Sequence, residues 1–400
     1  MAPDRRGFLQ TLATLPGVGG VMSWFAAPGQ AADGQRRDVY RELGVRPLIN
    51  AAGTYTSLTG SLMPAEVVEA IRSAASQFVH LGELQEAVGK KIAARIGCEA
   101  ALVTAGAASA LTLGTAACVT GSDRDKIRRI PDTAGMKNEV IIQKSHHFDF
   151  DHALRNVGVK FVDVETEEDV KRAVTDKTAM MFFLNHEDPV GKIHAEEFAR
   201  LGKKLGVPTF NDAAADVPPV ENLTRFLKMG FDLVCFSGGK GLRGPQSAGL
   251  LLGRKDLIES AALNNNPHSD SVCRTNKVGK EELVGMWAAV DWFLNQDPTA
   301  MWREWERRVA VIADAVKPLD GVKTEMFVPP IANHVPHLRI TWDAAKRKLT
   351  PIEAGQKLRD GEPAIEVRPG SKEALEVAVW MLEPGEDKIV ARRIREVLGG

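Results

Sequence analysis

The chain has 400 residues, with 51 basic and 52 acidic side chains and a formal net charge of −1 at pH 7. This balance supplies no overall positive charge for nucleic acid or an anionic membrane surface. With 44% hydrophobic and 26% charged residues, the composition excludes intrinsic disorder and predicts a substantial core. The cysteines are too sparse for a disulfide framework and form no CxxC pair, so we expect free thiols at Cys98, Cys118, Cys235 and Cys273.

The first 32 residues have the pattern of an export signal. An arginine pair, Arg5-Arg6, precedes a weakly apolar run without charge that contains Pro and Gly and ends in small residues at Ala31-Ala32. We interpret residues 1–32 as a twin-arginine signal peptide and expect an exported, periplasmic protein. The alternative is an N-terminal tail with an accidental arginine pair, in which case the protein is cytoplasmic.

A second uncharged stretch, residues 100–122, is long enough to span a membrane. Its glycines, together with several Thr and Ser residues, make it too polar for stable insertion. We therefore predict a short strand, 101–104, followed by a buried helix, and no membrane span.

Short apolar runs alternate with helical patterns between Glu99 and Gly253. This alternation predicts an α/β fold with a mostly parallel seven-stranded sheet covered by helices on both faces. Ligands of such sheets bind at the carboxyl ends of the strands. The predicted strands are 101–104, 140–143, 159–164, 179–184, 208–212, 233–237 and 249–252.

The pattern changes near Lys280. We predict helices over 64–80 and 84–96 before the sheet, and long helices over 281–294 and 301–316 after it. Strands over 322–327, 338–342, 365–368 and 375–381 then alternate with helices over 351–358 and 387–398. These features suggest residues 33–280 as an N-terminal arm with a large domain, and residues 281–400 as interdomain helices with a smaller α+β domain.

The loop after the strand 233–237 contains the sequence Ser237-Gly-Gly-Lys240-Gly. It is not a Walker loop, because Val234 and Gly241 stand where that motif needs Gly and Ser or Thr. Asp212 ends the preceding strand, 240 − 212 = 28 residues earlier. A Gly-containing turn at 104–109 provides a nest of backbone N–H groups for an anion, and a histidine pair, 146–147, ends another strand. All four features fall at the same predicted sheet edge.

Together these residues resemble the fold-type I pyridoxal-phosphate (PLP) enzymes of the class V aminotransferase and cysteine desulfurase group. The segments Ile49-Asn-Ala-Ala-Gly-Thr54 and Gly239-Lys-Gly-Leu-Arg-Gly-Pro-Gln246 are similar to the family of bacterial selenocysteine synthase and D-glucosaminate-6-phosphate ammonia-lyase. The resemblance extends from about Tyr40 to the C-terminus.

The resemblance implies a role for each residue. Lys240 would form a Schiff base with pyridoxal 5'-phosphate and act as the acid and base at Cα of the substrate. Asp212 would keep the pyridine nitrogen protonated, and His147 would stack on the ring. The groups expected to hold the phosphate are Gly106, Ala107, Ala108, Ser109 and Ser237.

Four further residues are candidates for binding substrate. Arg368 ends a predicted strand. The sequence equally supports an arginine that binds a substrate carboxylate and an ordinary solvent-exposed arginine at a strand end. Arg243 is a candidate for a substrate carboxylate or phosphate. Asn50 and Tyr55 line the pocket if this chain follows its relatives.

Two alternatives are weakened by particular residues. Ala215 stands where the desulfurases have Gln, and no cysteine stands where a persulfide-carrying loop is expected, so sulfur abstraction is disfavoured. The His and Asp residues of 146–152 would not converge on a metal in a strand, and we expect no metal site.

We therefore predict a PLP-dependent lyase or transferase acting on a small amino acid or amino-sugar acid. The favoured reaction is an α,β-elimination that gives a keto acid and ammonia. The alternatives are a racemase or aminotransferase, a seryl-tRNA seleniumtransferase-like enzyme, and a catalytically silent binding module with this fold. Selenium transfer is disfavoured because we do not find the extra N-terminal tRNA-binding segment of true selenocysteine synthases, and because the expected export would separate the protein from tRNA. The resemblance also implies a homodimer or a higher homo-oligomer.

Overall fold

The computed structural model describes residues 37–368 and 372–399. The predicted signal peptide, residues 1–32, lies outside the described residues. The chain divides into two units at Pro47. In the first unit the described part is a short helix, α2 (Val39–Glu42), whose first turn is capped by the Asp38 carboxylate.

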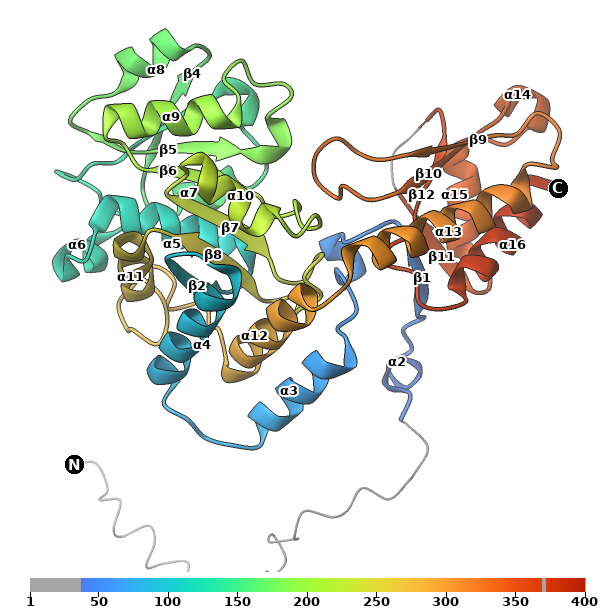
Figure 1. The fold of residues 1–400 in the computed structure, drawn as a ribbon, viewed down its shortest axis with the longest axis horizontal. Helices are drawn as coiled ribbons and strands as arrows, with labels where there is room; N and C mark the ends of the chain where they lie inside the picture. Colours follow the sequence, from blue (N-terminus) through green and yellow to red (C-terminus); the bar gives the residue numbers. More distant parts are fainter. Residues whose placement is uncertain (1–36, 369–371, 400) are drawn as a thin grey trace, which may run out of the picture. The chain divides into compact units, whose positions relative to one another are not determined.

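The unit Leu48–Gly400 contains a seven-stranded sheet, drawn in the left half of Figure 1. Its strand order is β2-β8-β7-β6-β5-β3-β4, with parallel pairing from β7 to β4 and antiparallel pairing of β8 with both neighbours. The predicted sheet is confirmed, each strand ending within one residue of the predicted limits. The strands are β2 (Ala100–Thr104), β3 (Glu139–Gln143), β4 (Lys160–Val164), β5 (Thr178–Leu184), β6 (Thr209–Asp212), β7 (Leu233–Ser237) and β8 (Gly249–Gly253).

Both faces of this sheet are covered, because its central strands are apolar on both sides. Every residue of β5 is buried, and the adjacent side chains Phe182 and Phe183 belong to separate cores on opposite faces. One core is closed by α4 (Leu81–Ile96), α9 (Ala195–Leu205), α10 (Asn222–Met229) and α12 (Lys280–Leu294). The other is closed by α5 (Gly106–Thr120), α7 (Asp151–Arg155) and α11 (Lys255–Leu263).

The uncharged stretch at 100–122 forms β2 and the buried helix α5, as predicted. Across the part of the chain that the structure describes, no helix combines the length and apolar character needed to cross a bilayer. All four cysteines are free, two buried and two half-buried. The remaining helices beside the sheet are α3 (Ala65–Ala75), α6 (Arg124–Arg129) and α8 (Glu167–Ala173).

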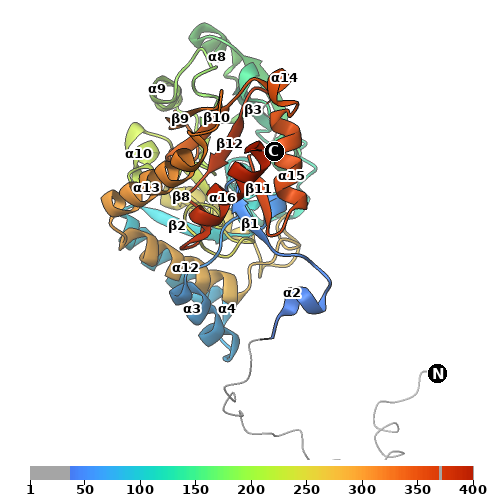
Figure 2. The same ribbon diagram turned by 90° about the vertical axis from the view of Figure 1, so that its right-hand side faces the viewer.

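The C-terminal region has its own core, built on a three-stranded antiparallel sheet of order β12-β10-β9 and a separate parallel pair, β1 with β11 (Figure 2). The strand β1 (Leu48–Ala51) is not predicted from the sequence, because its partner is more than 300 residues away. The other elements are α13 (Pro298–Val316), β9 (Lys323–Phe327), β10 (His337–Thr341), α14 (Ala344–Arg347), α15 (Pro351–Asp360), β11 (Ala364–Val367), β12 (Leu375–Ala378) and α16 (Glu386–Gly399).

Two predicted elements are too long. The helix expected over 64–80 ends at Ala75, since the apolar residues beyond it, including the fully exposed Phe78, find no core to pack on in the described chain. The strand expected over 375–381 ends at Ala378, where a turn begins. The division into two domains at residue 280 stays a prediction, although β1 packs in the C-terminal core.

The close packing of α5 on the sheet gives a stability prediction. A Cβ at Gly114 would overlap the Phe210 ring, so Gly114→Ala should lower the free energy of unfolding by about 1–3 kcal/mol. Gly82→Ala, on the exposed first turn of α4, meets nothing and should stabilise by up to about 1 kcal/mol. Urea unfolding measures both. Equal stability of the two variants would contradict this packing.

Candidate active site at the carboxyl edge of the sheet

The strand register brings the predicted site residues to one edge of the sheet. Thr104 lies opposite Gly249, which lies opposite Ser237 on its other side. Asp212 lies between Cys235 and Leu184 on the neighbouring strands. The turn that starts α5, the end of β6 and the lysine loop after β7 therefore meet at this edge, as predicted.

Asp212 is a buried carboxyl with few protein partners. One carboxylate oxygen accepts a hydrogen bond from the backbone N–H of Ala214 at 2.9 Å and from the Cys235 thiol at 3.6 Å. Burial raises the pKa of Asp212, and these hydrogen bonds and the positive charge of Lys240 act in the opposite direction. A cationic group placed against this carboxylate would favour its ionised form.

Lys240 lies half-buried in the turn that follows β7. Burial lowers the pKa of its amine, while the charges of Asp212 and Asp216 oppose that change. The residue after Lys240 must be a glycine, because the backbone of Val217 lies so close that a Cβ at Gly241 would overlap its carbonyl. The loop thus holds a lysine amine, with a lowered pKa, near a buried carboxylate.

Lys240 opens into a cavity of about 90 Å³, called here the lysine cavity. It includes two of the predicted substrate residues, Tyr55 and Arg368. Arg368 forms an ion pair with Glu376 at 3.4 Å and is partly exposed. The other lining residues are Ala52, Gly53, Thr54, Asn333, His337 and Trp380.

Three of these lining residues are not predicted from the sequence: Asn333, His337 and Trp380. These residues belong to no motif, and they reach the lysine cavity only because the C-terminal region folds against the lysine loop. The segment that carries Asn333 is fixed there by a hydrogen bond of 2.8 Å from its backbone N–H to the carbonyl of Ala215. No local pattern predicts such a long-range contact.

Asn50 shapes the cavity wall from a distance. Its side-chain oxygen accepts hydrogen bonds from the backbone N–H groups of Ala52 and Gly53, and its amide donates to the carbonyl of Gly53 at 2.9 Å. Asn50 is absent from the residues that line the cavity. It fixes the turn that carries the lining residues 52–55.

Arg243 lies outside the lysine cavity. It donates to the carbonyl of Leu62 at 2.7 Å, pairs with Glu383 at 3.1 Å and lies over the Trp292 ring at 5.7 Å. It lines a neighbouring cavity of about 280 Å³ that shares Trp380. Its guanidinium is therefore already paired in this structure.

The predicted phosphate site is an uncapped helix start. The α5 helix follows Ala105, which makes no side-chain cap, and Gly106 has φ of +72°. The first-turn N–H groups of Gly106, Ala107 and Ala108 have no intrahelical acceptor, which makes this end a favourable anion site. A Cβ at Gly249 would come within 2.7 Å of the nitrogen of Ala107. A glycine is therefore needed here for β8 to pack closely against the start of α5.

Two hydroxyls accompany this helix start. The Ser109 hydroxyl accepts a hydrogen bond from the Asn276 amide at 2.8 Å. Ser237 ends β7, and its backbone N–H donates to the carbonyl of Ala214 at 3.2 Å. Both serines lie where the register brings α5 and β7 together.

The histidine pair is tightly held. The two ring nitrogens of His147 contact Asp151 at 2.5 Å and Asp163 at 2.9 Å. Burial alone would lower the pKa of His147, but the hydrogen bonds to Asp163 and Asp151 outweigh it and raise the pKa. His146 is fully buried, and burial lowers its pKa to about 4. Neither lines the lysine cavity, so the stacking role of His147 stays a prediction.

A second carboxyl, Asp216, was not found from the sequence. It is 4% exposed, accepts a hydrogen bond from the Ala332 backbone at 3.1 Å and bonds to the Asn185 side chain. Burial raises the pKa of Asp216 to about 6. Its charge acts on Lys240, so it belongs to the electrostatics of the site.

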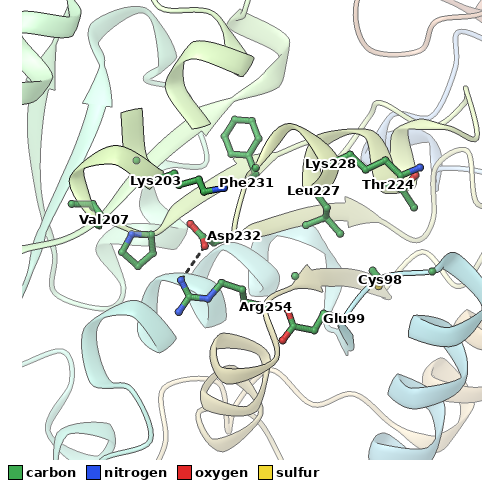
Figure 3. A pocket seen from close by; sticks show the side chains of 16 residues that line it. Cys98, Glu99, Lys203, Val207, Thr224, Leu227, Lys228, Phe231, Asp232 and Arg254 are labelled. Carbon is green, nitrogen blue, oxygen red and sulfur yellow. Dashed lines mark hydrogen bonds and ion pairs between the residues drawn. The ribbon is translucent and has the colours of Figure 1, made fainter. Parts of the chain in front are cut away.

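A larger cavity of about 640 Å³ lies at the opposite edge of the sheet (Figure 3). It contains Lys203 and the ion pair of Arg254 with Asp232 at 3.0 Å. Asp232 precedes β7, whereas Lys240 follows it, so this cavity is separate from the lysine cavity. Within 37–368 and 372–399, no three His, Cys, Asp or Glu side chains gather as a metal site.

Known proteins are similar to this chain over between half and nine-tenths of its length. The D-glucosaminate-6-phosphate ammonia lyase of Salmonella typhimurium is 28% identical over 376 residues, which is 90% of this chain and 98% of that protein. A 5'-C-glycyluridine monooxygenase-decarboxylase of Streptomyces sp is 29% identical over 374 residues, 90% of this chain and 92% of that protein. The L-seryl-tRNA(Sec) selenium transferase of Aquifex aeolicus is 27% identical over 241 residues, so the match spans about half of each chain.

Solved structures agree in fold. The structure of a D-glucosaminate-6-phosphate ammonia-lyase superposes with a TM-score of 0.80 at 26% identity, covering 91% of this chain and 99% of that one. Serine palmitoyltransferase from S. paucimobilis with bound PLP superposes with a TM-score of 0.56 at 13% identity, covering 88% and 87%. This second likeness concerns the fold alone.

The family model described as L-seryl-tRNA selenium transferase (SelA) matches residues 48–302, more than half of the chain. The match contains the sheet, Asp212 and the lysine loop. The chain therefore belongs to the SelA family and has the fold of the fold-type I PLP-dependent enzymes.

Proposed function

We propose that this protein binds pyridoxal 5'-phosphate at Lys240 and catalyses an α,β-elimination on an amino acid or amino-sugar acid, with a keto acid and ammonia as products. The observation that carries the proposal is that the neighbouring strands β6 and β7 lead to buried Asp212 and to Lys240, whose charges act on each other, and that Lys240 lines a cavity that also holds Arg368. The similarity to D-glucosaminate-6-phosphate ammonia lyase over nearly its full length supports this reaction.

The residues present fit this cofactor. Asp212 has an acceptor for a protonated pyridine nitrogen, and the uncapped start of α5 with Ser109 and Ser237 has the groups for a phosphate. Among the buried polar atoms that lack a partner in the described part of the chain, Trp380 Nε1 and Asn333 Oδ1 belong to residues that line the lysine cavity. When bound, the cofactor withdraws electrons from Cα of an amino acid.

The chain's own residues would then transfer the proton at Cα and bind the substrate carboxylate. Because burial lowers its pKa, the Lys240 amine holds its proton less tightly than an exposed lysine and suits proton transfer at Cα. Arg368 presents a guanidinium for the substrate carboxylate, in competition with Glu376.

Other reactions use the same residues. A racemase or aminotransferase needs the same lysine and carboxylate, and the glycyluridine relative carries the name of yet another reaction. The named selenium transferase of Aquifex aeolicus matches this chain over only about half of its length, which favours a lyase. A silent binding module has no need for both Lys240 and Asp212.

We also propose an exported homodimer. Residues 1–32 support export through their twin-arginine pattern.

Exposed apolar side chains near α3, including Leu62, Phe78 and Val79, favour coverage by a second copy. Light scattering during size-exclusion chromatography should give twice the chain mass; a monomer at micromolar concentration would contradict the dimer.

Lys240→Ala should abolish the visible absorption of the purified protein with its cofactor and lower activity by at least about 100-fold, because the acid/base at Cα is lost. Asp212→Asn should keep the band and lose about 10- to 100-fold in rate, since a charged hydrogen bond becomes neutral. Spectra and steady-state rates on the same preparations measure both effects. A wild-type protein without a visible band after incubation with the cofactor would contradict the proposed function.

Asp216→Asn should lower the pKa of the Lys240 amine in the cofactor-free protein, because a negative charge that raises this pKa is removed. The neutral amine captures the cofactor aldehyde, so the rate of capture should reach its plateau at a lower pH than in the wild type. Stopped-flow absorption across a pH series measures the shift. Asp314→Asn, an exposed change on α13, is the control and should leave the profile in place; an Asp216→Asn profile that coincides with the wild type refutes the coupling.

Export is tested by fractionating cells that make the wild type or the Arg5→Lys, Arg6→Lys double variant. The wild type should appear in the periplasm and the variant should stay in the cytoplasm. Equal cytoplasmic retention of both proteins would contradict the signal assignment.

A further inference from the structure

The connection between α11 and α12, residues 264–279, is called here the asparagine loop. Two of its asparagines bind α5. The Asn264 amide donates to the Thr120 hydroxyl at the C-terminal end of that helix at 3.1 Å, and the Asn276 amide donates to the Ser109 hydroxyl in its first turn at 2.8 Å. The loop is therefore fastened to α5 near both of its ends.

The position of Asn276 is fixed by hydrogen bonds within the loop. Buried Asn266 pairs with the backbone of Val278, accepting from its N–H at 2.8 Å and donating to its carbonyl at 3.3 Å. The N–H of Cys273 donates to the carbonyl of Asn264, and the N–H of Asn276 donates to the carbonyl of Cys273, both at 3.1 Å. These bonds hold the Asn276 side chain against α5.

The Ser109 hydroxyl is used differently from other hydroxyls on helices. Thr115 in the same helix and Ser260 in α11 each donate to the carbonyl four residues earlier, at 2.8 Å. Within the described chain, the Ser109 hydroxyl makes no such bond and only accepts from Asn276. A serine hydroxyl has one hydrogen, so the hydrogen of Ser109 stays available for a ligand.

The Ser109 side chain leans toward the start of α5, because Cα–Cβ bonds in a helix tilt toward the N-terminus. The first-turn N–H groups of Gly106, Ala107 and Ala108 have no intrahelical acceptor at that end. The backbone groups and the Ser109 hydroxyl all supply hydrogens there. Such a set of donors suits an anion whose oxygens only accept, such as a phosphate.

The Asn276 amide has partners on both of its polar atoms. Its Oδ1 accepts from the Thr275 hydroxyl at 3.0 Å, and its Nδ2 lies 2.8 Å from the Ser109 oxygen and 3.7 Å from the Cys273 sulfur. Because Nδ2 can only donate, Ser109 cannot spend its hydrogen on Asn276. A side chain that accepts at this position would take that hydrogen.

We infer that Asn276 is a positioning residue of the phosphate site: by donating to Ser109, it reserves the Ser109 hydrogen for the phosphate of the cofactor. This inference rests on the proposed function for the identity of the anion. It gives a role to the asparagine loop, which contributes no residue to the lysine cavity.

The test uses purified protein whose cofactor has been removed with hydroxylamine. Its probes are pyridoxamine 5'-phosphate and pyridoxamine, which differ only in the phosphate. Neither has an aldehyde, so binding does not depend on a Schiff base with Lys240. Isothermal titration calorimetry measures the dissociation constants. The wild type should bind the phosphorylated amine at least about 100-fold more tightly.

Asn276→Ala should weaken binding of pyridoxamine 5'-phosphate about tenfold, because Ser109 can then donate to the helix backbone, and should change pyridoxamine binding by less than twofold. Asn276→Asp should weaken the phosphorylated amine further, because the carboxylate takes the Ser109 hydrogen and repels the phosphate. Ser269→Ala, an exposed change in the same loop, is the control and should leave both constants unchanged. Circular dichroism confirms that the variants fold.

Ser109→Ala separates positioning from general support of the loop. This variant should also lose about tenfold in affinity for pyridoxamine 5'-phosphate. Adding Asn276→Ala to it should cause no further loss, since Asn276 acts through the Ser109 hydroxyl. A role in holding the loop alone would lower the affinity again in the double variant.

The outcomes separate the two proposals. Equal loss for both amines in Asn276→Ala, wild-type affinity in Asn276→Asp, or a further tenfold loss in the double variant refutes the role of Asn276 and leaves the proposed function standing. If the wild type does not prefer the phosphorylated amine, the cofactor assignment fails and this inference fails with it. If the expected affinities are found but pyridoxal phosphate gives no visible band, the inference holds and the proposed chemistry at Lys240 fails.

Discussion

The candidate site depends on one electrostatic relation, that of a buried carboxylate with a half-buried lysine close to the carboxyl ends of two neighbouring parallel strands. Asp212 and Lys240 shift each other's pKa, and burial acts against the charged form of both. The large sheet brings the two residues together, because the cores on both of its faces hold β6 and β7 side by side in register. A cationic ring against Asp212 and a covalent partner for Lys240 would resolve both burial costs together.

The C-terminal region completes the site. Its core contains β1, which lies at the start of the unit Leu48–Gly400, so residues from both ends of that unit share one core. The turn organised by Asn50 supplies one wall of the lysine cavity, and the segment at 332–337 supplies another. Asp216 links this segment to the loop after β6. A substitution in this part of the C-terminal region would therefore act directly on the polar groups around Lys240.

Much of the fold and part of the site were predictable from local patterns. Strands such as β5 are uniformly apolar because they are buried on both faces, and Asp212 and Lys240 follow strands whose ends must share an edge. The sequence pattern does not predict β1, because a four-residue strand is too short to show a periodicity and its partner strand is far away in the sequence. It also does not contain His337 or Trp380, which gain their positions from tertiary contacts alone. Arg243 and Arg368 look alike in the sequence, yet only Arg368 lines the lysine cavity.

The proposed function requires that Lys240 binds the cofactor covalently. Reduction of the purified protein with borohydride after incubation with pyridoxal phosphate, followed by proteolysis and mass spectrometry, tests it directly. We expect one modified lysine, in the peptide that contains Lys240. A modification spread over exposed lysines, or none on this peptide, would contradict covalent binding at Lys240.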